Sequence, residues 1–261
     1  MLVVYKKMIS FFFNKNSGSG KIRGYQIGKY LGAKMNPKDG YENDVCIYVK
    51  KRPPENHPKN TYLDIVDCRQ RLFWIKRHPN VKVIACSVTS YFFLKRTVKN
   101  EIIYIPQHHC NFKREIKMNY GNVKGVVGRE WSISEGIESL IPNFVWVKDF
   151  KHRQDVIDGY KKIDIQIIWR KIHLQTSKVP SRMVNQMFLK NPLKIINAMS
   201  FGIPTIAYPE ICNEEVKDFY FKADKIEDLF KPIKYDRERL IDKAEEYHID
   251  NVSKLYKQLD N

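Results

Sequence analysis

The sequence predicts an α/β protein made of two doubly wound parallel-sheet domains with a cleft between them. Short apolar runs alternate with helical patterns along the chain, a rhythm typical of parallel strands joined by crossover helices. The 261 residues are enough for two domains of ordinary size. The rhythm breaks at a polar and basic stretch, 112–122, and then restarts. We therefore expect one domain at residues 1–118 and a second at residues 119–261.

Each domain is expected to alternate strands with helices. Apolar runs bounded by turn residues predict the strands, and amphipathic patterns predict the helices. In the first domain we expect strands at 8–13, 44–49, 62–66, 81–87 and 101–106, and helices at 21–31, 68–77 and directly after 81–87. In the second we expect strands at 124–127, 144–147, 163–169 and 203–208, and helices at 152–162, 192–200, 214–221, 225–230 and 237–259.

Nearly all of the net charge of +17 lies in the first half of the chain. Residues 1–120 contain 23 Lys and Arg against 8 Asp and Glu, whereas the remaining 141 residues contain 23 against 21. Lysine-rich codon usage would have raised both halves alike, so we interpret the first domain as the one that meets an anionic partner. DNA and an anionic membrane surface both fit. The aromatic residues that could stack on bases are Tyr25, Tyr30, Phe73, Trp74, Tyr91 and Phe92.

Several other classes of protein are disfavoured. The sequence has no apolar run of the roughly 20 residues that a transmembrane helix needs. The apolar opening at 1–13 is interrupted by Lys6 and Lys7, so we expect a strand there and not an export signal. Five cysteines without a C-x-x-C pair suit reduced thiols and a cytoplasmic location, that of the host if the chain is viral. We expect no metal, because Cys110 and its two histidine neighbours cannot easily face one ion.

A glycine-rich loop at 16–24 follows the first predicted strand. It is not a P-loop, because Lys15 stands where that motif needs glycine and Ile22 stands where it needs Ser or Thr. The loop still leads from a strand into a helix, where backbone N–H groups can receive an anionic or hydroxyl-bearing ligand. We expect Gly20 to approach the donor substrate there. A flexible turn without a ligand is the alternative.

The segment 191–210 carries the strongest signal in the chain. Pro192 suits the first turn of a helix, and Gly202 and Pro204 end that helix before a buried strand. The first helical N–H groups, at residues 193–195, would carry partial positive charge suited to a diphosphate. Candidate binding residues are therefore Leu193, Lys194 and, one turn inside, Asn197. A helix that binds no ligand satisfies the same local physics.

This segment resembles the donor-site helix of GT-B glycosyltransferases, which are built from two Rossmann-like domains. The matching positions are Lys194, Asn197, Ala198, Met199, Gly202, Pro204, Ile206 and Ala207. The resemblance implies that Asn197 meets the ribose of a nucleotide-sugar and that the helix start meets its diphosphate. Residues 19–32 are similar to the first loop and helix of such enzymes, which face acceptor and donor. We place Lys21, Arg23 and Tyr25 in the acceptor site on this basis.

The resemblance also implies basic residues that hold the donor diphosphate. Arg129, Arg170 and Lys171 follow predicted strands of the second domain, where guanidinium groups could bind phosphate bidentately and stabilise the leaving nucleotide without a metal. Retaining members often carry two glutamates eight residues apart, and this chain departs from them with Leu189 and Asn197 at those positions.

A catalytic base should come from the first domain. His108 and His109 follow the strand at 101–106, and imidazole suits proton transfer near neutral pH. Three carboxylates are rivals, and no spacing selects among them: Asp39, Asp64 and Asp67.

We therefore expect a hexosyltransferase that moves a sugar from a nucleotide-sugar, a UDP-sugar by preference, to an anionic acceptor. No cofactor is expected to be tightly bound. One acceptor is a hydroxymethylated base in DNA, as for a phage-type DNA-modifying enzyme, reached by flipping the base out. An alternative is a peripheral-membrane glycosyltransferase acting on a lipid-linked or polysaccharide acceptor. A further alternative is a non-catalytic nucleic-acid-binding protein with a GT-B-like fold.

Overall fold

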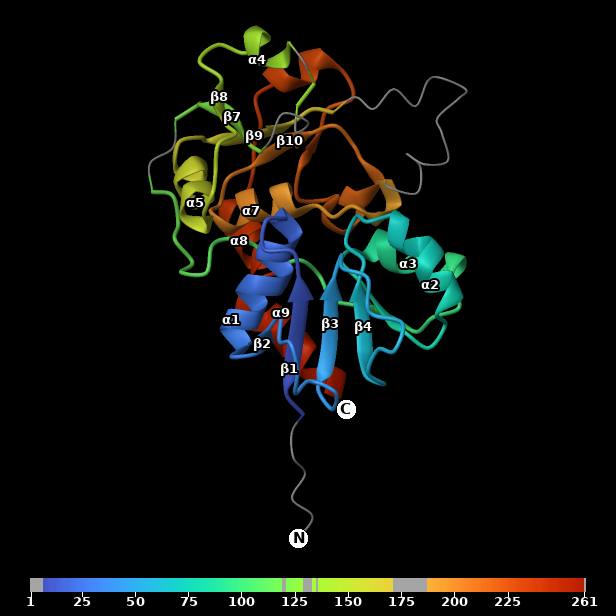
Figure 1. Cartoon of the computed structure of the whole chain (residues 1–261). Coiled ribbons are helices and arrows are strands. Elements are labelled where there is room, and N and C mark those ends of the chain that lie inside the picture. Colours follow the sequence, from blue (N-terminus) through green and yellow to red (C-terminus); the bar gives the residue numbers. More distant parts are fainter. Residues whose placement is uncertain (1–6, 119–120, 129–132, 135, 171–186, 261) are drawn as a thin grey trace. The chain divides into compact units, whose positions relative to one another are not determined.

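The computed structural model describes residues 7–118, 121–128, 133–134, 136–170 and 187–260. The chain forms two compact units, each built on one parallel sheet (Figure 1). Unit 1 comprises Met1–His108, Pro180–Asn191 and Ile249–Asn261, and unit 2 comprises His109–Val179 and Pro192–His248. The predicted α/β class with two parallel sheets is confirmed. The unit boundaries differ from the predicted split at residues 118 and 119, because the chain enters unit 1 three times.

Unit 1 has a six-stranded sheet in which every pair of neighbouring strands is parallel. The strands come from the predicted apolar runs, apart from a two-residue edge strand that the sequence pattern does not reveal. In spatial order they are β2 (Lys34–Met35), β1 (Ile9–Phe13), β3 (Val45–Val49), β4 (Thr61–Asp64), β5 (Lys82–Ala85) and β6 (Ile102–Tyr104).

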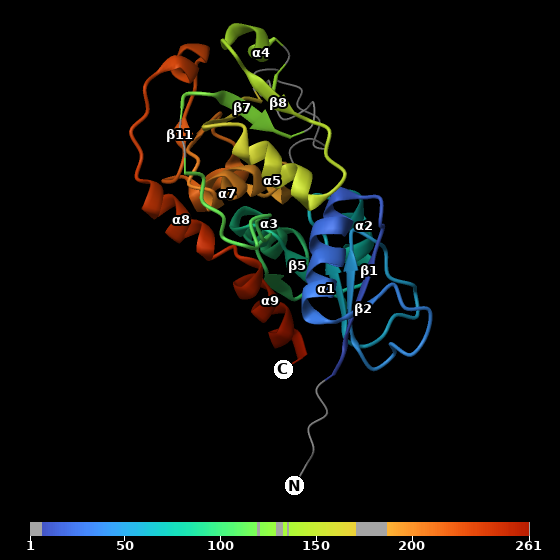
Figure 2. The same cartoon turned by 90° about the vertical axis from the view of Figure 1, so that its left-hand side faces the viewer.

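The helices of unit 1 cover both faces of this sheet. From β3 to β6 the strands advance in one direction, so right-handed crossovers place α2 (Gln70–Arg77) and α3 (Val88–Thr97) on the same face. The step from β1 to β2 runs the opposite way, which places the π-helix η1 (Gly20–Gln26) and α1 (Ile27–Leu31) on the other face. The C-terminal helix α9 (Ile249–Lys257) packs against α1 (Figure 2). The chain ends in a 3-10 turn, η5 (Gln258–Asp260).

One glycine lets the first helix lie directly on its strand. A Cβ atom added at Gly24 of η1 would lie 2.4 Å from Cγ of Phe13, the last residue of β1. Only a residue without a side chain permits that approach. The expected helix at 21–31 therefore begins as a π-helix pressed against β1 and becomes α-helical from Ile27.

Unit 2 has a five-stranded parallel sheet with helices joined to it in the expected β-then-α order. In spatial order its strands are β11 (Phe221–Lys222), β10 (Thr205–Ala207), β9 (Ile165–Ile168), β7 (Lys124–Val127) and β8 (Val145–Val147). Its helical elements are α4 (Ile137–Leu140), α5 (Arg153–Lys161), α7 (Leu193–Ser200), η3 (Ile211–Val216), η4 (Ile226–Phe230) and α8 (Arg237–Glu245). Buried residues of the strands and of α5 and α7 form the core.

Two predicted helices have different limits in the structure. The segment expected as one helix at 237–259 is two helices, α8 and α9, which belong to different units. The break lies at Tyr247 and His248, where the carbonyl of Tyr247 accepts the backbone N–H of His109 at 3.0 Å and His248 Nε2 lies 3.1 Å from the carbonyl of Phe112. The segment expected as a helix at 214–221 is the 3-10 helix η3 followed by the edge strand β11.

Candidate functional site

The strand order of unit 2 predicts where a ligand would bind. From β7 the chain steps to β8 on one side and then crosses back to β9 on the other side. The topological switch point therefore lies between the carboxyl ends of β7 and β9, which is where doubly wound sheets bind ligands. Gly128 follows β7 at this position, and Trp169 and Arg170 follow β9.

Arg170 is held at the carboxyl end of β9 by a bidentate ion pair. Its Nε donates to Oε1 of Glu210 at 2.7 Å, and its Nη2 donates to Oε2 at 2.8 Å. Glu210 is buried and follows the neighbouring strand β10, whereas Arg170 is only partly buried. A guanidinium fork of this kind binds carboxylate or phosphate with the same geometry. The pair therefore holds a guanidinium in one orientation beside the switch point, with its charge balanced by Glu210.

Helix α7 begins at Leu193, after Pro192, and leads into β10. The turn that follows the helix contains Gly202, whose φ of +69° lets its N–H and that of Ile203 return to the carbonyls of Met199 and Ala198 at 2.8 and 2.9 Å. The positive end of the helix dipole lies at Leu193 and Lys194. The predicted helix, turn and strand order of this segment is confirmed.

Asn197 is committed to contacts within unit 2. The side chain is buried, and its Oδ1 accepts the backbone N–H of Cys110 at 2.9 Å. The carboxamide also hydrogen-bonds the hydroxyl of Tyr160 on α5, and that hydroxyl donates to the carbonyl of Lys194 at 3.2 Å. In this structure the Asn197 side chain therefore joins α7 to α5 and to the chain at Cys110. Binding of ribose by Asn197 stays a prediction.

Arg129 and Lys171 lie outside the described residues. Of the four basic residues that the sequence assigns to the donor, the structure therefore places Arg170 and Lys194. Both are partly exposed. As expected, Arg170 follows β9 and Lys194 lies in the first turn of α7.

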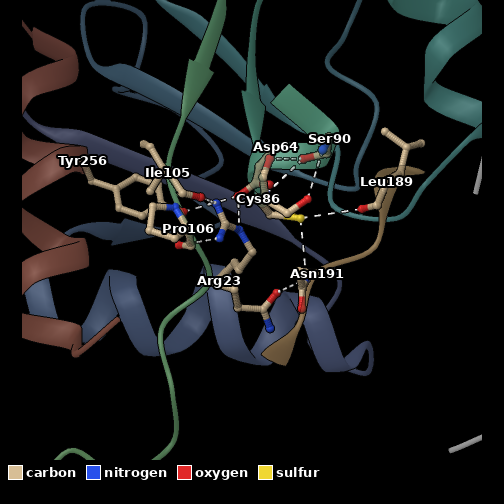
Figure 3. A network of polar contacts seen from close by, with 11 residues as sticks. Arg23, Asp64, Cys86, Ser90, Ile105, Pro106, Leu189, Asn191 and Tyr256 are labelled. Atoms are coloured by element: carbon tan, nitrogen blue, oxygen red, sulfur yellow. Dashed lines mark hydrogen bonds and ion pairs between the residues drawn. The ribbon is translucent and has the colours of Figure 1, made fainter. Parts of the chain in front are cut away.

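In unit 1, Arg23 lies in a fully buried network (Figure 3). Its Nε donates to Oδ2 of Asp64 at 2.5 Å, and its two Nη atoms donate to the carbonyls of Pro106 and Ile105 at 3.0 Å each. Tyr256 of α9 donates to the same Oδ2 atom at 3.3 Å. Although burial alone would lower it, the Asp64 carboxylate holds the pKa of Arg23 above its usual value. The prediction that Arg23 binds the acceptor is wrong, because its guanidinium is enclosed and ties η1 to β4 and to the chain after β6. Asp64 is likewise removed from the candidate bases.

Residues 189–191 complete this network on the side of β5. The amide of Asn191 donates to Oε1 of Gln107 at 2.8 Å and lies 3.5 Å from Sγ of Cys86. The Cys86 thiol in turn lies 3.7 Å from the carbonyl of Leu189 (Figure 3). Leu189 itself is completely buried in the core of unit 1.

Several backbone N–H groups of the glycine-rich loop donate to acceptors within the loop itself. The N–H of Ser17 donates to the carbonyl of Asn14 at 3.1 Å, and the N–H of Gly20 donates to Oγ of Ser17 at 2.9 Å. The N–H of Lys21 donates to the carbonyl of Ser17 at 2.9 Å. A Cβ atom at Gly20 would lie 2.1 Å from the carbonyl oxygen of Asn14. Glycine is therefore required at residue 20 by the fold of the loop itself. Lys21 and Tyr25 are exposed on η1, and their place in the acceptor site stays a prediction.

The two candidate histidines are buried in different units. His108 lies 3.0 Å through Nε2 from Oε1 of Gln26 on η1. His109 accepts the N–H of Asn111 at its Nδ1, 3.1 Å away, and its ring meets that of His248 edge to face. Burial, together with the charges of His248 and Arg114, lowers the pKa of His109 to about 3. The ring of His109 is therefore neutral at physiological pH and is held by unit 2.

The sequence analysis did not identify three residues that hold the candidate residues or their neighbours in place. Glu210 pairs with Arg170, Tyr256 with Asp64, and Asn191 with Gln107. A signal existed only for Glu210, which follows a predicted strand in the way that Arg170 does.

Among the described residues, no group of three histidine, cysteine or acidic side chains could hold a metal ion. Across that same part of the chain, no helix combines the length and apolar character that crossing a membrane requires.

No protein-family model and no curated protein matches the sequence. A crystal structure described as a GtfA/B complex is similar to the chain, with a TM-score of 0.47 and 11% sequence identity. The likeness covers 87% of this chain and 56% of the other, so the chain spans a little over half of that structure's length. It assigns no activity to this chain.

Proposed function

We propose that the chain is a GT-B-type glycosyltransferase that binds the diphosphate of a nucleotide-sugar, a UDP-sugar by preference, through unit 2. The observation that carries the proposal is the placement of Arg170 beside the switch point of a doubly wound sheet. The segment 191–210 contains α7 and β10 and ends at Glu210, the partner of Arg170, and its sequence resembles the donor helix of that family. Ligand binding at a switch point and phosphate binding at a helix N-terminus are general properties of such sheets.

The chemistry follows from the charges at this edge of the sheet. A diphosphate leaving group gains negative charge as the glycosidic bond to the donor breaks. Arg170 would bind two of its oxygens bidentately, and the amino end of α7, with Lys194, would stabilise the rest of that charge. No metal is needed for this step. Arg129 and Lys171 are proposed as further phosphate ligands on their sequence positions alone.

Glu210 would keep Arg170 in place. The carboxylate fixes the guanidinium in one orientation, and a diphosphate would either share its N–H groups or displace the carboxylate. His108, His109, Asp39 and Asp67 remain the candidate bases for the acceptor hydroxyl. The proposed acceptor is anionic because unit 1 carries most of the net charge. A hydroxymethylated base in DNA is the acceptor we would test first.

One observation favours a second candidate, a nucleic-acid-binding protein without catalysis. Leu189 and Asn197 replace the glutamate pair of retaining enzymes, and both serve structural contacts here. A protein that lost the chemistry and kept the fold would show the same features.

Thermal unfolding with a panel of UDP, GDP, ADP and their sugars, in the presence of EDTA, separates the two functions. The proposed enzyme is stabilised by one nucleotide family without added metal, and hydroxymethylated duplex DNA then releases that nucleotide from its sugar. If no nucleotide raises the unfolding temperature while duplex DNA does, the non-catalytic function replaces the proposed one.

A further inference from the structure

The helices α2 and α3 of unit 1 carry the same exposed pattern, a phenylalanine followed one turn later by a lysine and an arginine. In α2 these residues are Phe73, Lys76 and Arg77, and in α3 they are Phe92, Lys95 and Arg96. Positions three and four residues apart share one side of a helix, so each phenyl ring and its basic pair lie on the same outward stripe.

The outward direction of these stripes follows from what the inner sides do. Leu72, Trp74 and Ile75 of α2 and Leu94 of α3 are buried in the core of unit 1. The two phenylalanines are instead 62% and 56% exposed, and the four basic residues are exposed as well. Because both helices lie on one face of the sheet and run in the same direction, the stripes form one surface, which we call the α2–α3 face.

The α2–α3 face lies within a segment that has no acidic residue. Residues 68–100 contain eight Lys and Arg and no Asp or Glu. Asp67 and Glu101 bound the segment, and they pair with Lys50 and Lys82. None of the four basic residues of the two stripes is therefore neutralised by an acidic side chain of its own helix.

Exposed phenylalanine indicates an apolar occupant as well as a negatively charged one. A phenyl ring has no group that hydrogen-bonds water, so its exposure is costly unless a partner covers it. The outward side of α3 is apolar over its first two turns, where Tyr91 contacts Phe92 at a ring separation of 5.4 Å, and basic only in its last turn. Amphipathic helices that lie in a bilayer interface place aromatic residues at the acyl boundary and Lys or Arg against anionic headgroups.

We propose that the α2–α3 face docks unit 1 on an anionic lipid surface, with Phe73 and Phe92 entering the headgroup region and the four basic side chains binding lipid phosphates. This goes beyond the proposed function, since it concerns binding to a lipid surface by two helices that carry none of the proposed donor or acceptor residues, and it needs no nucleotide. Nucleic acid fits α3 less well as the occupant, because the cations of α3 gather in its last turn and its aromatic residues lie in the turns before. In α2 basic residues lie on both sides of Phe73, and the guanidinium of Arg69 lies 5.8 Å from the centroid of that ring.

Sedimentation with vesicles tests the proposal on the full chain. We expect the protein to bind vesicles of phosphatidylglycerol and phosphatidylcholine, to bind less as salt rises, and to leave vesicles of phosphatidylcholine alone unbound. The double variant Phe73→Ser with Phe92→Ser should weaken binding by about tenfold or more, because the apolar contact is lost. Lys95→Gln with Arg96→Gln should weaken it by about tenfold, because two headgroup contacts are lost.

Two control variants match these changes elsewhere on the surface. Phe230→Ser removes an exposed phenylalanine from unit 2, and Lys38→Gln with Lys59→Gln removes two exposed charges from unit 1 outside the helices. Both should bind vesicles like the unaltered protein. The proposal is overturned if anionic vesicles do not bind, if the phenylalanine variant binds unchanged, or if duplex DNA binds in preference and displaces the vesicles. Nucleotide binding measured on the same samples reports on the proposed function separately.

Discussion

The Nε atom of Arg23 donates to Oδ2 of Asp64 at 2.5 Å, and both side chains are fully buried. The pair joins a helix that follows β1 to the last residue of β4. Tyr256 from the C-terminal helix donates to the same carboxylate. Three distant parts of the sequence therefore depend on one ion pair, which makes it a structural centre of unit 1.

Arg23→Gln should destabilise the protein by about 3–5 kcal/mol, because the Asp64 carboxylate is left buried without its counter-charge. Urea unfolding followed by circular dichroism measures the change. Lys29→Gln, on the exposed side of α1, is the control and should stay within about 0.5 kcal/mol of the unaltered protein. A loss below about 1 kcal/mol for Arg23→Gln would show that the pair does not hold the fold.

Gly24→Ala should destabilise the protein by about 1–3 kcal/mol, since the new methyl group meets the ring of Phe13 at the end of β1. Gly18→Ala serves as the matched control, because no atom lies within 4 Å of the added Cβ there. The comparison uses thermal unfolding of the two single variants. Equal unfolding temperatures would contradict the close packing of η1 on β1.

His109 should make stability fall on acidification. Its pKa of about 3 in the folded protein lies below the ordinary value near 6.5, so unfolding takes up a proton between these pH values. Because its pKa is lowered in the folded state, His109 contributes its full share of the stability above pH 6.5, and the protein loses that share as the pH falls from 6.5 toward 3. From pH 7 to pH 5 the loss from this residue is about 2 kcal/mol.

Measuring the unfolding free energy of the protein and of His109→Asn at both pH values tests this. The variant keeps an acceptor near the N–H of Asn111 and lacks the titrating ring, so it should lose about 2 kcal/mol less on going to pH 5. Identical losses in both proteins would mean that His109 is protonated normally in the folded state.

Asn197→Ala should destabilise the protein by about 1–3 kcal/mol even without nucleotide, because the N–H of Cys110 loses its buried acceptor. Asn56→Ala, at an exposed loop position, is the control. Chemical unfolding in the absence of ligand measures both. Unchanged stability together with lost nucleotide binding would instead give Asn197 the ribose-binding role that the sequence resemblance implies.

The sequence was enough to predict most of the strands and the bounds of α7. It did not predict which polar side chains are buried or which partners they contact. Apolar runs such as Val45–Val49 define buried parallel strands by themselves, and Pro192 with Gly202 bounds α7 through local backbone preferences. Arg23 was placed in the acceptor site because residues 19–32 resemble the first loop and helix of GT-B enzymes. Asp64 lies 41 residues from Arg23 along the chain, and Tyr256 lies 192 residues from Asp64. No local sequence pattern reports such contacts.

The C-terminal segment shows the same limit. A single amphipathic pattern runs across 237–259, yet the carbonyl of Tyr247 accepts from His109 and the helix divides there. A tertiary hydrogen bond overrides a continuous helical propensity, and a sequence gives no warning of it. In unit 2 the position of Arg170 followed from the strand end, but its pairing with Glu210 required the register of β9 against β10.

Isothermal titration of UDP into the protein tests the central claim most directly, with Arg170→Ala/Glu210→Ala as the decisive variant. The double change removes both partners and so leaves no lone buried carboxylate, and Lys222→Ala on the exposed edge strand of unit 2 is the control. We predict that the unaltered protein and the control bind with equal Kd and that the double variant binds about ten- to a hundredfold more weakly, as expected for a lost charged contact. Equal binding by all three proteins, or no binding of UDP, GDP or ADP by any of them, would contradict a nucleotide site at Arg170.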